Sequence, residues 1–169
     1  GHSILNRAFY GVPIFTNSEG LHTNAVFGFL NIMFKIIDSK QPDYMAVAFD
    51  VHQPTFRHEM FKDYKGTRKP MMEELREQVP VIKELLQKMN ITTVELPGYE
   101  ADDVIGTLSK KGEKAGMEVD VISGDRDLLQ LASDHITICI PKTKKGQTTV
   151  EESNTEGVRK LYKVTPTEF

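Results

Sequence analysis

Six carboxylates follow three apolar, strand-like segments of the sequence, and together they could hold metal ions. The segment YMAVAF at 44–49 leads into the first acid, and ITTVEL at 91–96 leads through a Pro-Gly turn into the next three. The segment VDVIS at 119–123 leads into the last two. The six acids are Asp50, Glu100, Asp102, Asp103, Asp125 and Asp127. If the three strands are parallel neighbours, their carboxyl ends share one edge of a sheet and the acids converge there.

Clustered carboxylates repel one another strongly unless positive charge neutralises them. Mg²⁺ and Mn²⁺ are hard cations that prefer oxygen ligands, whereas Cys and His ligands at zinc spacing are absent from the sequence. On a helix, Glu100 and Asp103 would share a face, with Asp102 offset by roughly 100°. Such a triplet suits two neighbouring ions, and two ions about 3.5–4 Å apart are a standard device for phosphodiester hydrolysis.

Each acidic group also has a structural interpretation. Glu100, Asp102 and Asp103 would favour the macrodipole at the start of a helix. Asp127 could be the N-cap of the short helix that follows it, and Asp50 could cap a loop. The coincidence of acids at three strand ends favours the metal site over three separate caps.

The segment from 51 to 70, VHQPTFRHEMFKDYKGTRKP, is basic and aromatic. Its candidate DNA-binding residues are Arg57, Lys62, Lys65, Arg68 and Lys69, with the aromatic residues Phe56 and Tyr64 between them. Lys and Arg contact phosphates, and aromatic rings stack on unpaired bases. A solvated, amphipathic loop helix is the alternative. Because the segment directly follows Asp50, it could hold an anionic strand over metal ions. Arg7 is a further candidate phosphate contact.

Strand-like and helix-like segments alternate along the chain, which predicts an α/β fold with a mainly parallel central sheet flanked by helices. The predicted helices are 24–38, 71–89, 101–115, 127–132 and 155–163, and the predicted strands are 44–49, 91–96, 119–123 and 136–140. Pro80 should kink or divide the second helix. A hairpin should turn near Gly146. At 169 residues, the chain fits a single domain spanning 1–169.

The bulk composition limits the possible partners. The net charge is −3, so any contact with a nucleic acid must come from a local basic patch. The sequence contains no apolar run of about 18 residues, and we expect no membrane contact. The single cysteine, Cys139, is expected to be a small buried apolar residue, as in the reducing cytoplasm.

Four stretches of the sequence resemble one known family. GHSILNRAFYG, AFD followed by FRHEMFKDYKGTRKPM, GYEADDVIGTL and SGDRDLLQL are similar to the 5′-nuclease domain of bacterial DNA polymerase I. The flap endonuclease and PIN-like superfamily includes this domain. The resemblance covers nearly the whole chain, and GYEADD together with GDRD is its most specific part.

The resemblance implies a structure-selective 5′-3′ exonuclease or flap endonuclease that uses two or more Mg²⁺ or Mn²⁺ ions. Its substrates would be 5′ flaps, nicked or 5′-ended duplexes and RNA primer–DNA hybrids, in replication and repair. The six acids match the acidic positions of the family. Arg57, Lys65 and Arg68 match an arch or clamp that engages the 5′ strand, and Arg7 matches a position near the scissile phosphate. The resemblance also implies a resolvase-like core, a covalently linked polymerase domain and a cytoplasmic monomer.

The sequence departs from the family at its two ends. In the family, a strand and an Asp precede the GHS motif, and a GDSSDNIPG-like stretch with a DNA-gripping helical hairpin follows the position of Phe169. We therefore expect a core truncated at both ends, with weakened metal affinity. The expected activity of this chain is weak or absent, although the intact protein is a nuclease.

Three other interpretations stay open at this point. A glutamate followed by Asp-x-Asp after a strand is also found in the Toprim metal site of topoisomerases and primases. A PIN-type ribonuclease is a related possibility with a smaller acidic set. A non-catalytic or degenerate DNA-binding module would use the acids only structurally.

Overall fold

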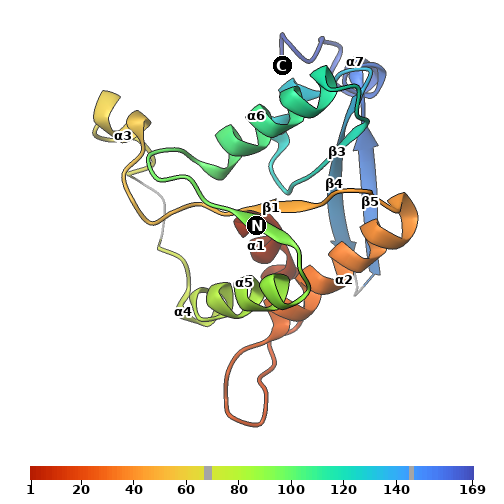
Figure 1. Cartoon of the computed structure of the whole chain (residues 1–169). Coiled ribbons are helices and arrows are strands. Elements are labelled where there is room, and N and C mark those ends of the chain that lie inside the picture. The colour runs from red at the N-terminus through yellow and green to blue at the C-terminus, as the bar shows by residue number, and fades with distance from the viewer. Residues whose placement is uncertain (67–69, 145–146) are drawn as a thin grey trace. The chain divides into compact units, whose positions relative to one another are not determined.

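A computed structural model of the chain describes residues 1–66, 70–144 and 147–169 (Figure 1). It divides into two compact units, Gly1–Ala101 and Asp102–Phe169. Each unit has its own strands and its own helices, and each is described by itself below. Among the described helices, none combines the length and the apolar character needed to cross a membrane.

In its described residues, the first unit contains two parallel strands and five helices. In chain order, they are α1 (His2–Gly11), α2 (Asn24–Lys40), β1 (Ala46–Ala48), α3 (Phe56–Met60), α4 (Glu73–Arg76), α5 (Gln78–Lys88) and β2 (Thr92–Val94). β1 pairs with β2 in parallel, with Ala46 opposite Thr92. The carboxyl ends of both strands therefore lie at the same edge, as the sequence predicts.

Helix α1 is the main element of this unit that the sequence prediction lacks. Its buried residues Ile4, Leu5, Ala8 and Phe9 form one apolar face, at the spacing of an amphipathic helix. α1 packs closely on α2. A Cβ atom added at Gly28 would lie only 2.8 Å from the Cβ atom of Ala8. A glycine in α2 thus allows the two helices to approach.

Pro80 lies near the break between α4 and α5. The two helices are separated at Glu77, which confirms that the predicted helix over 71–89 is divided. Pro80 is the third residue of α5, where a backbone N–H would have no partner within the helix. Proline is therefore tolerated there, and it begins a new helix instead of kinking a long one.

A buried polar network joins the helices of the first unit. Gln78 Oε1 accepts hydrogen bonds from the backbone N–H groups of Ala25 (2.8 Å) and Val26 (3.1 Å), at the N-terminus of α2. Its Nε2 donates to Asn24 Oδ1 (3.0 Å) and to the Glu74 carbonyl (2.7 Å). Gln78 and Asn24 are both fully buried. A side chain from α5 thus satisfies amides that a local N-cap residue satisfies in most helices.

The described part of the second unit is a three-stranded sheet with two α-helices and a 3₁₀ helix. Its elements are α6 (Ala101–Lys114, which begins at the unit boundary), β3 (Val119–Ile122), the 3₁₀ helix η1 (Arg126–Leu131), β4 (Ile136–Lys144), β5 (Gln147–Ser153) and α7 (Thr155–Tyr162). β4 lies between β3, to which it is parallel, and β5, to which it is antiparallel. Its core includes Val121, Leu129, Ile138 and Val158.

The strands confirm the α/β prediction with one difference in the sheet. Both β1–β2 and β3–β4 are parallel pairs, but the described strands form two separate sheets, not one continuous sheet. The predicted hairpin is present as β4–β5, where Lys144 pairs with Gln147, and its turn at Gly146 lies outside the described residues. Cys139 is fully buried in β4, as expected.

Candidate active site

Asp50 and the start of α6 meet at the carboxyl edge of the β1–β2 pair. Asp50 follows β1 closely, and its Oδ1 accepts a hydrogen bond from the backbone N–H of Ala101 at 2.8 Å. Ala101 directly follows Glu100, so this bond ties the Asp50 side chain to the backbone next to Glu100. This placement agrees with the rule that sites form where parallel strands end.

The carboxylate of Asp50 is stabilised in its charged form. The His2 ring lies against it, with Nδ1 3.4 Å from Oδ2 and 3.3 Å from the Asp50 backbone nitrogen. The hydrogen bond with His2 and the Ala101 amide together lower the pKa of Asp50 to about 2, against an opposing effect of partial burial. Asp50 is therefore ionised at neutral pH, as a metal ligand must be.

Glu100 lies against positive charge from the segment 51–70. Lys65 Nζ is 2.6 Å from Glu100 Oε1, and an Arg57 guanidinium nitrogen is 3.9 Å from Oε2. The Tyr64 hydroxyl donates to Oε2 at 3.4 Å. The Glu100 side chain is only 13% exposed, so these contacts are only partly screened by water. Here cationic side chains supply the neutralisation that the sequence argument assigns to metal ions.

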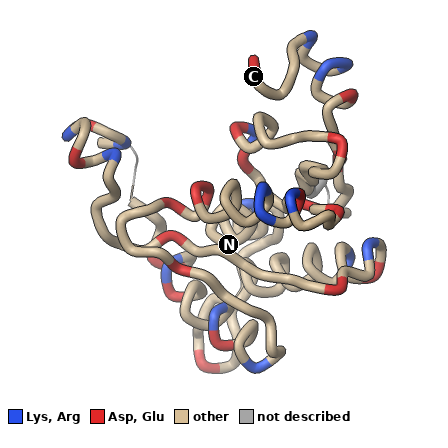
Figure 2. Tube along the Cα trace, turned by 45° about the horizontal axis from the view of Figure 1, so that its top comes forward, with Lys and Arg blue, Asp and Glu red and all other residues tan. Residues whose placement is uncertain are grey.

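The basic segment is partly helical. Three of its predicted DNA-binding cations, Arg57, Lys62 and Lys65, are described, whereas Arg68 and Lys69 lie outside the described residues. Figure 2 shows that acidic and basic positions alternate along α3 and the residues that directly follow it, here called the α3 segment (residues 55–66). The predicted contacts of all five cations with DNA stay predictions.

The base of α3 is fixed by side-chain and backbone contacts. Thr55 and His58 form a capping box, in which the Thr55 backbone N–H lies 3.1 Å from His58 Nδ1. The Phe56 backbone N–H donates to the Gly98 carbonyl at 3.1 Å. This bond ties the base of α3 to the Pro-Gly turn that precedes Glu100.

In the second unit, Asp125 and Asp127 form a local turn after β3. The Asp125 backbone N–H donates to Ser123 Oγ at 3.1 Å, and Asp125 Oδ1 accepts from the Asp127 backbone N–H at 2.9 Å. Asp125 is thus the N-cap of η1, whereas the structural interpretation of the sequence assigns that place to Asp127. The cap lies two residues earlier than predicted, because η1 already begins at Arg126.

Asp102 and Asp103 lie in the first turn of α6. Acids at this position are stabilised by the helix macrodipole. Glu100 precedes the first residue of the helix, Ala101, so the predicted face shared by Glu100 and Asp103 does not follow from helical geometry. The positions of Asp102 and Asp103 are consistent with either a cap-like or a ligand role.

The six predicted ligands are divided between the two units. Asp50 and Glu100 lie in the first unit, and the other four lie in the second. Within the described residues, no three Asp, Glu, His or Cys side chains gather at metal-binding distance. Convergence of all six acids stays a prediction. Arg7 lies in the middle of α1, and its contact with a phosphate also stays a prediction.

The chemistry of Asp50 and Glu100 fits a hard divalent cation. Both side chains offer only oxygen donors, Asp50 is ionised, and its Oδ1 is oriented by the Ala101 amide. Glu100 Oε1 is already in contact with a cation, the Lys65 ammonium group. A divalent ion at Glu100 would therefore take a place where the fold already favours positive charge.

Two residues at this edge are missing from the sequence prediction. His2 contacts Asp50 across 48 residues of sequence, and no local pattern indicates such a contact. Tyr99 contacts Phe56 in a tilted arrangement, with ring centroids 5.6 Å apart. Its position inside the GYEADD motif, next to Glu100, is a signal that could have identified it.

Comparisons with known proteins agree with this fold and identify the family of the chain. The family model of the 5′-3′ exonuclease, N-terminal resolvase-like domain, matches residues 1–163. The chain therefore belongs to this family, which confirms the resemblance inferred from its motifs. It is 51% identical to DNA polymerase I of Bacillus caldotenax over 98% of the chain and 19% of that protein. It is 42% identical to a 5′-3′ exonuclease of Aquifex aeolicus, over 83% of the chain and 49% of that protein.

Solved structures show the same fold at lower identity. The bacteriophage T5 flap endonuclease, in a pseudo-enzyme–product complex with DNA and metal ions, aligns with a TM-score of 0.66 at 23% identity. That alignment covers 84% of this chain and 54% of the phage chain. The catalytic core of Rad2 with a DNA substrate aligns with a TM-score of 0.50 at 16% identity, over 96% of this chain and 48% of that one. The chain spans about a fifth of the polymerase relatives, at 19%.

Proposed function

We propose that this domain is a metal-dependent, structure-selective 5′-nuclease, which hydrolyses phosphodiester bonds in DNA 5′ flaps and RNA primers during replication and repair. Membership of the exonuclease family supports the proposal. The observation that carries it is the contact of Glu100 with Lys65 and Arg57, next to the hydrogen bond that joins Ala101 to Asp50 at the strand edge. Nuclease chemistry requires such a pairing of acidic ligands with phosphate-binding cations.

The proposed cofactor is two or more Mg²⁺ or Mn²⁺ ions. Asp50, Glu100, Asp102, Asp103, Asp125 and Asp127 would hold them. When bound, the ions would act as Lewis acids on the phosphate and make water a stronger nucleophile. Solved structures of similar proteins contain divalent metal ions or DNA. The identity of the ions that this chain binds is part of the proposal.

The chain's own residues would bind, orient and neutralise the substrate. His2 and the Ala101 amide orient the Asp50 carboxylate, so that it needs little reorganisation when a ligand arrives. Arg57 and Lys65 would place a phosphate near Glu100, because both already lie against that carboxylate. The positive charge of these side chains would also stabilise the charge that develops on the phosphate oxygens.

The remaining parts of the proposal concern the whole protein. We propose a cytoplasmic monomer that acts on nicked or 5′-ended duplexes and primer hybrids, with a polymerase domain in the same polypeptide. The 51% identity to a DNA polymerase I supports the linked polymerase domain.

Cleavage of a labelled 5′-flap DNA tests the proposal. The protein is used in excess over the substrate, so that slow cleavage is measured, with Mg²⁺, Mn²⁺ or EDTA. We expect cleavage near the junction of flap and duplex only with divalent ions. Glu100→Gln should slow it by about 100-fold or more, because an ion contributes several kcal/mol to transition-state stabilisation.

Substitution of a distant acid is the matched control. Glu84 is exposed on α5, and Glu84→Gln removes the same charge without touching the strand edge. Glu84→Gln should cleave at the wild-type rate. Cleavage that persists in EDTA, or equal rates for Glu100→Gln and the wild type, would contradict the proposal. DNA binding without any cleavage would favour a non-catalytic module.

A further inference from the structure

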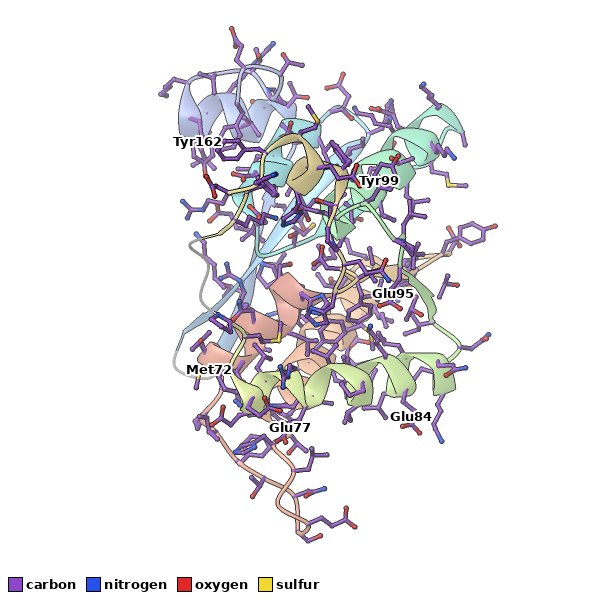
Figure 3. All side chains as sticks on the ribbon, turned by 90° about the vertical axis from the view of Figure 1, so that its left-hand side faces the viewer. Met72, Glu77, Glu84, Glu95, Tyr99 and Tyr162 are labelled. Carbon is purple, nitrogen blue, oxygen red and sulfur yellow. The ribbon has the colours of Figure 1, made fainter. Side chains whose placement is uncertain are left out.

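Two exposed aromatic rings from separate segments form one surface beside Glu100. Phe56 begins α3, and Tyr99 directly precedes Glu100. Their ring centroids are 5.6 Å apart with an interplanar angle of 53°. Phe56 is 37% exposed and Tyr99 is 49% exposed, so both residues reach the surface. Figure 3 labels Tyr99 close to the α3 turn.

The backbone beneath this pair is held firmly. The Phe56 N–H donates to the Gly98 carbonyl at 3.1 Å, and the Tyr99 N–H donates to the Leu96 carbonyl at 3.2 Å. Gly98 has a φ of +84°, a conformation that L side chains rarely adopt. The turn therefore presents Tyr99 in a defined position next to Phe56.

Positive charge lies over the Phe56 ring of the pair. The Arg57 guanidinium is 4.5 Å from the centroid of the Phe56 ring and 3.9 Å from Glu100. An aromatic surface with an adjacent cation matches a nucleotide, in which a flat base is joined to a phosphate. An apolar protein segment would gain nothing from the guanidinium or from the Glu100 carboxylate.

We propose that the exposed Tyr99 ring, with Phe56 against it at an angle, is a stacking platform for one unpaired nucleobase of the 5′ strand. The platform would place the phosphate of that nucleotide beside Arg57, at the edge that carries Asp50 and Glu100. It therefore gives Tyr99 a role as a residue that selects single-stranded over paired 5′ ends, because a paired base has both faces stacked in the duplex. This inference rests on the proposed function.

The test measures DNA binding separately from cleavage. Dissociation constants are measured by fluorescence anisotropy in EDTA, with two 5′-flap DNAs. One has normal bases throughout, and the other has abasic sites in the flap nucleotides nearest the junction. The wild type, Tyr99→Ala and Tyr99→Phe are compared. Tyr44→Ala is the matched control, because Tyr44 is 83% exposed and lies outside this surface.

On the normal flap, Tyr99→Ala should weaken binding by about 5- to 100-fold, the value of one stacked base. The wild type should lose a similar factor on the abasic flap, where Tyr99→Ala should add no further loss. Tyr99→Phe and Tyr44→Ala should bind as the wild type does. This non-additivity identifies a ring that acts through the base.

Two results would overturn the platform. Equal binding of the normal flap by the wild type and Tyr99→Ala would remove the contact with the base. Equal losses on both DNAs would show that Tyr99 does not act through the base and only supports the segment around α3. Neither result bears on the proposed function, which the cleavage rates with Mg²⁺ test separately. A wild type that binds neither flap would contradict both proposals.

Discussion

The acids of the first unit are held by distant residues, whereas Asp125 in the second unit is held by its neighbours. Asp50 accepts a hydrogen bond across 51 residues, and Glu100 contacts Lys65 across 35 residues. Asp125 bonds only two residues away, both to Ser123 and to Asp127. Acids at the first edge therefore depend on the tertiary fold, and Asp125 depends on a turn that the local sequence specifies.

This difference predicts which substitutions remove the charge of an acid without unfolding the protein. Asn is about as good an N-cap as Asp, so Asp125→Asn keeps the turn while it removes a negative charge. Asp50→Asn keeps an oxygen that accepts the hydrogen bond from the Ala101 N–H, but it removes the negative charge that faces the His2 ring. Both variants should lose cleavage, for the same chemical reason, and neither should unfold.

The largest expected effect is on cleavage by Asp50→Asn and Asp125→Asn. Each should slow single-turnover cleavage of a 5′ flap by about 100- to 1000-fold, because each removes a charged oxygen ligand. Flap binding in EDTA should change far less. If only one of the two variants lost cleavage, the acids of the two units would not belong to one site.

A loss of stability is expected next, in the polar network of the first unit. Gln78→Ala leaves buried amides of α2 without an acceptor and should lower the free energy of unfolding by about 2–4 kcal/mol. Gln87→Ala, at an exposed position of the same helix α5, is the control and should change it by less than about 0.5 kcal/mol. Urea denaturation followed by circular dichroism measures both. Similar midpoints for the two variants would contradict the role of Gln78.

Much of the fold could be predicted from the sequence, because it is locally encoded. The helices at 24–40 and 101–114 follow from apolar periodicity, and the four strands β1 to β4 follow from short apolar runs. The extra helix α1 carries the same periodicity and was also predictable. The division of the strands between two sheets was not, because hydrophobic pattern does not specify strand partners.

The candidate site was predictable only in part. The motifs identify Asp50 and Glu100, but the ion pair of Glu100 with Lys65 depends on how the chain folds back. The contact of His2 with Asp50 has the same origin. Convergence of the two acidic groups remains a prediction from the family resemblance.

Removal of the Lys65–Glu100 ion pair should have a smaller effect, and it should strengthen metal binding. Lys65→Met removes a cation that competes for Glu100, and it should tighten Mn²⁺ binding by roughly fivefold, the equivalent of about 1 kcal/mol. Lys62→Met, in the same segment, is the control and should leave the affinity unchanged. Isothermal titration measures both. Weaker binding by Lys65→Met would show that Lys65 does not compete with the ion.

Helix capping should give an effect of similar size in the second unit. Asp125→Ala removes the N-cap of η1 and should lower the free energy of unfolding by about 1 kcal/mol. Asp125→Asn should not, because its amide oxygen also accepts from the Asp127 N–H. Thermal denaturation of the two variants separates these cases. Equal melting temperatures would mean that the local turn contributes no stability.

The smallest expected effects are opposite pH dependences in the two units. Bonds from His22 lower the pKa of Glu77, so their stabilising effect is present above pH 4.5 and is lost as the pH falls. A bond with Glu118 raises the pKa of His135, so that effect is present below pH 6.5 and is lost as the pH rises. Glu77→Gln should make the melting temperature less dependent on pH in the acidic range. Glu118→Gln should do the same in the neutral range. A common pH profile for both variants would contradict this assignment.

Mn²⁺ binding tests the central claim most directly, because it asks whether the acids at the strand edge hold a divalent ion. Electron paramagnetic resonance counts the free Mn²⁺ during a titration of the wild type, Glu100→Gln and the control Glu84→Gln. The proposed site predicts saturable binding by the wild type and the control, and a loss of at least about tenfold in affinity for Glu100→Gln. Equal Mn²⁺ affinity in all three proteins would contradict the account.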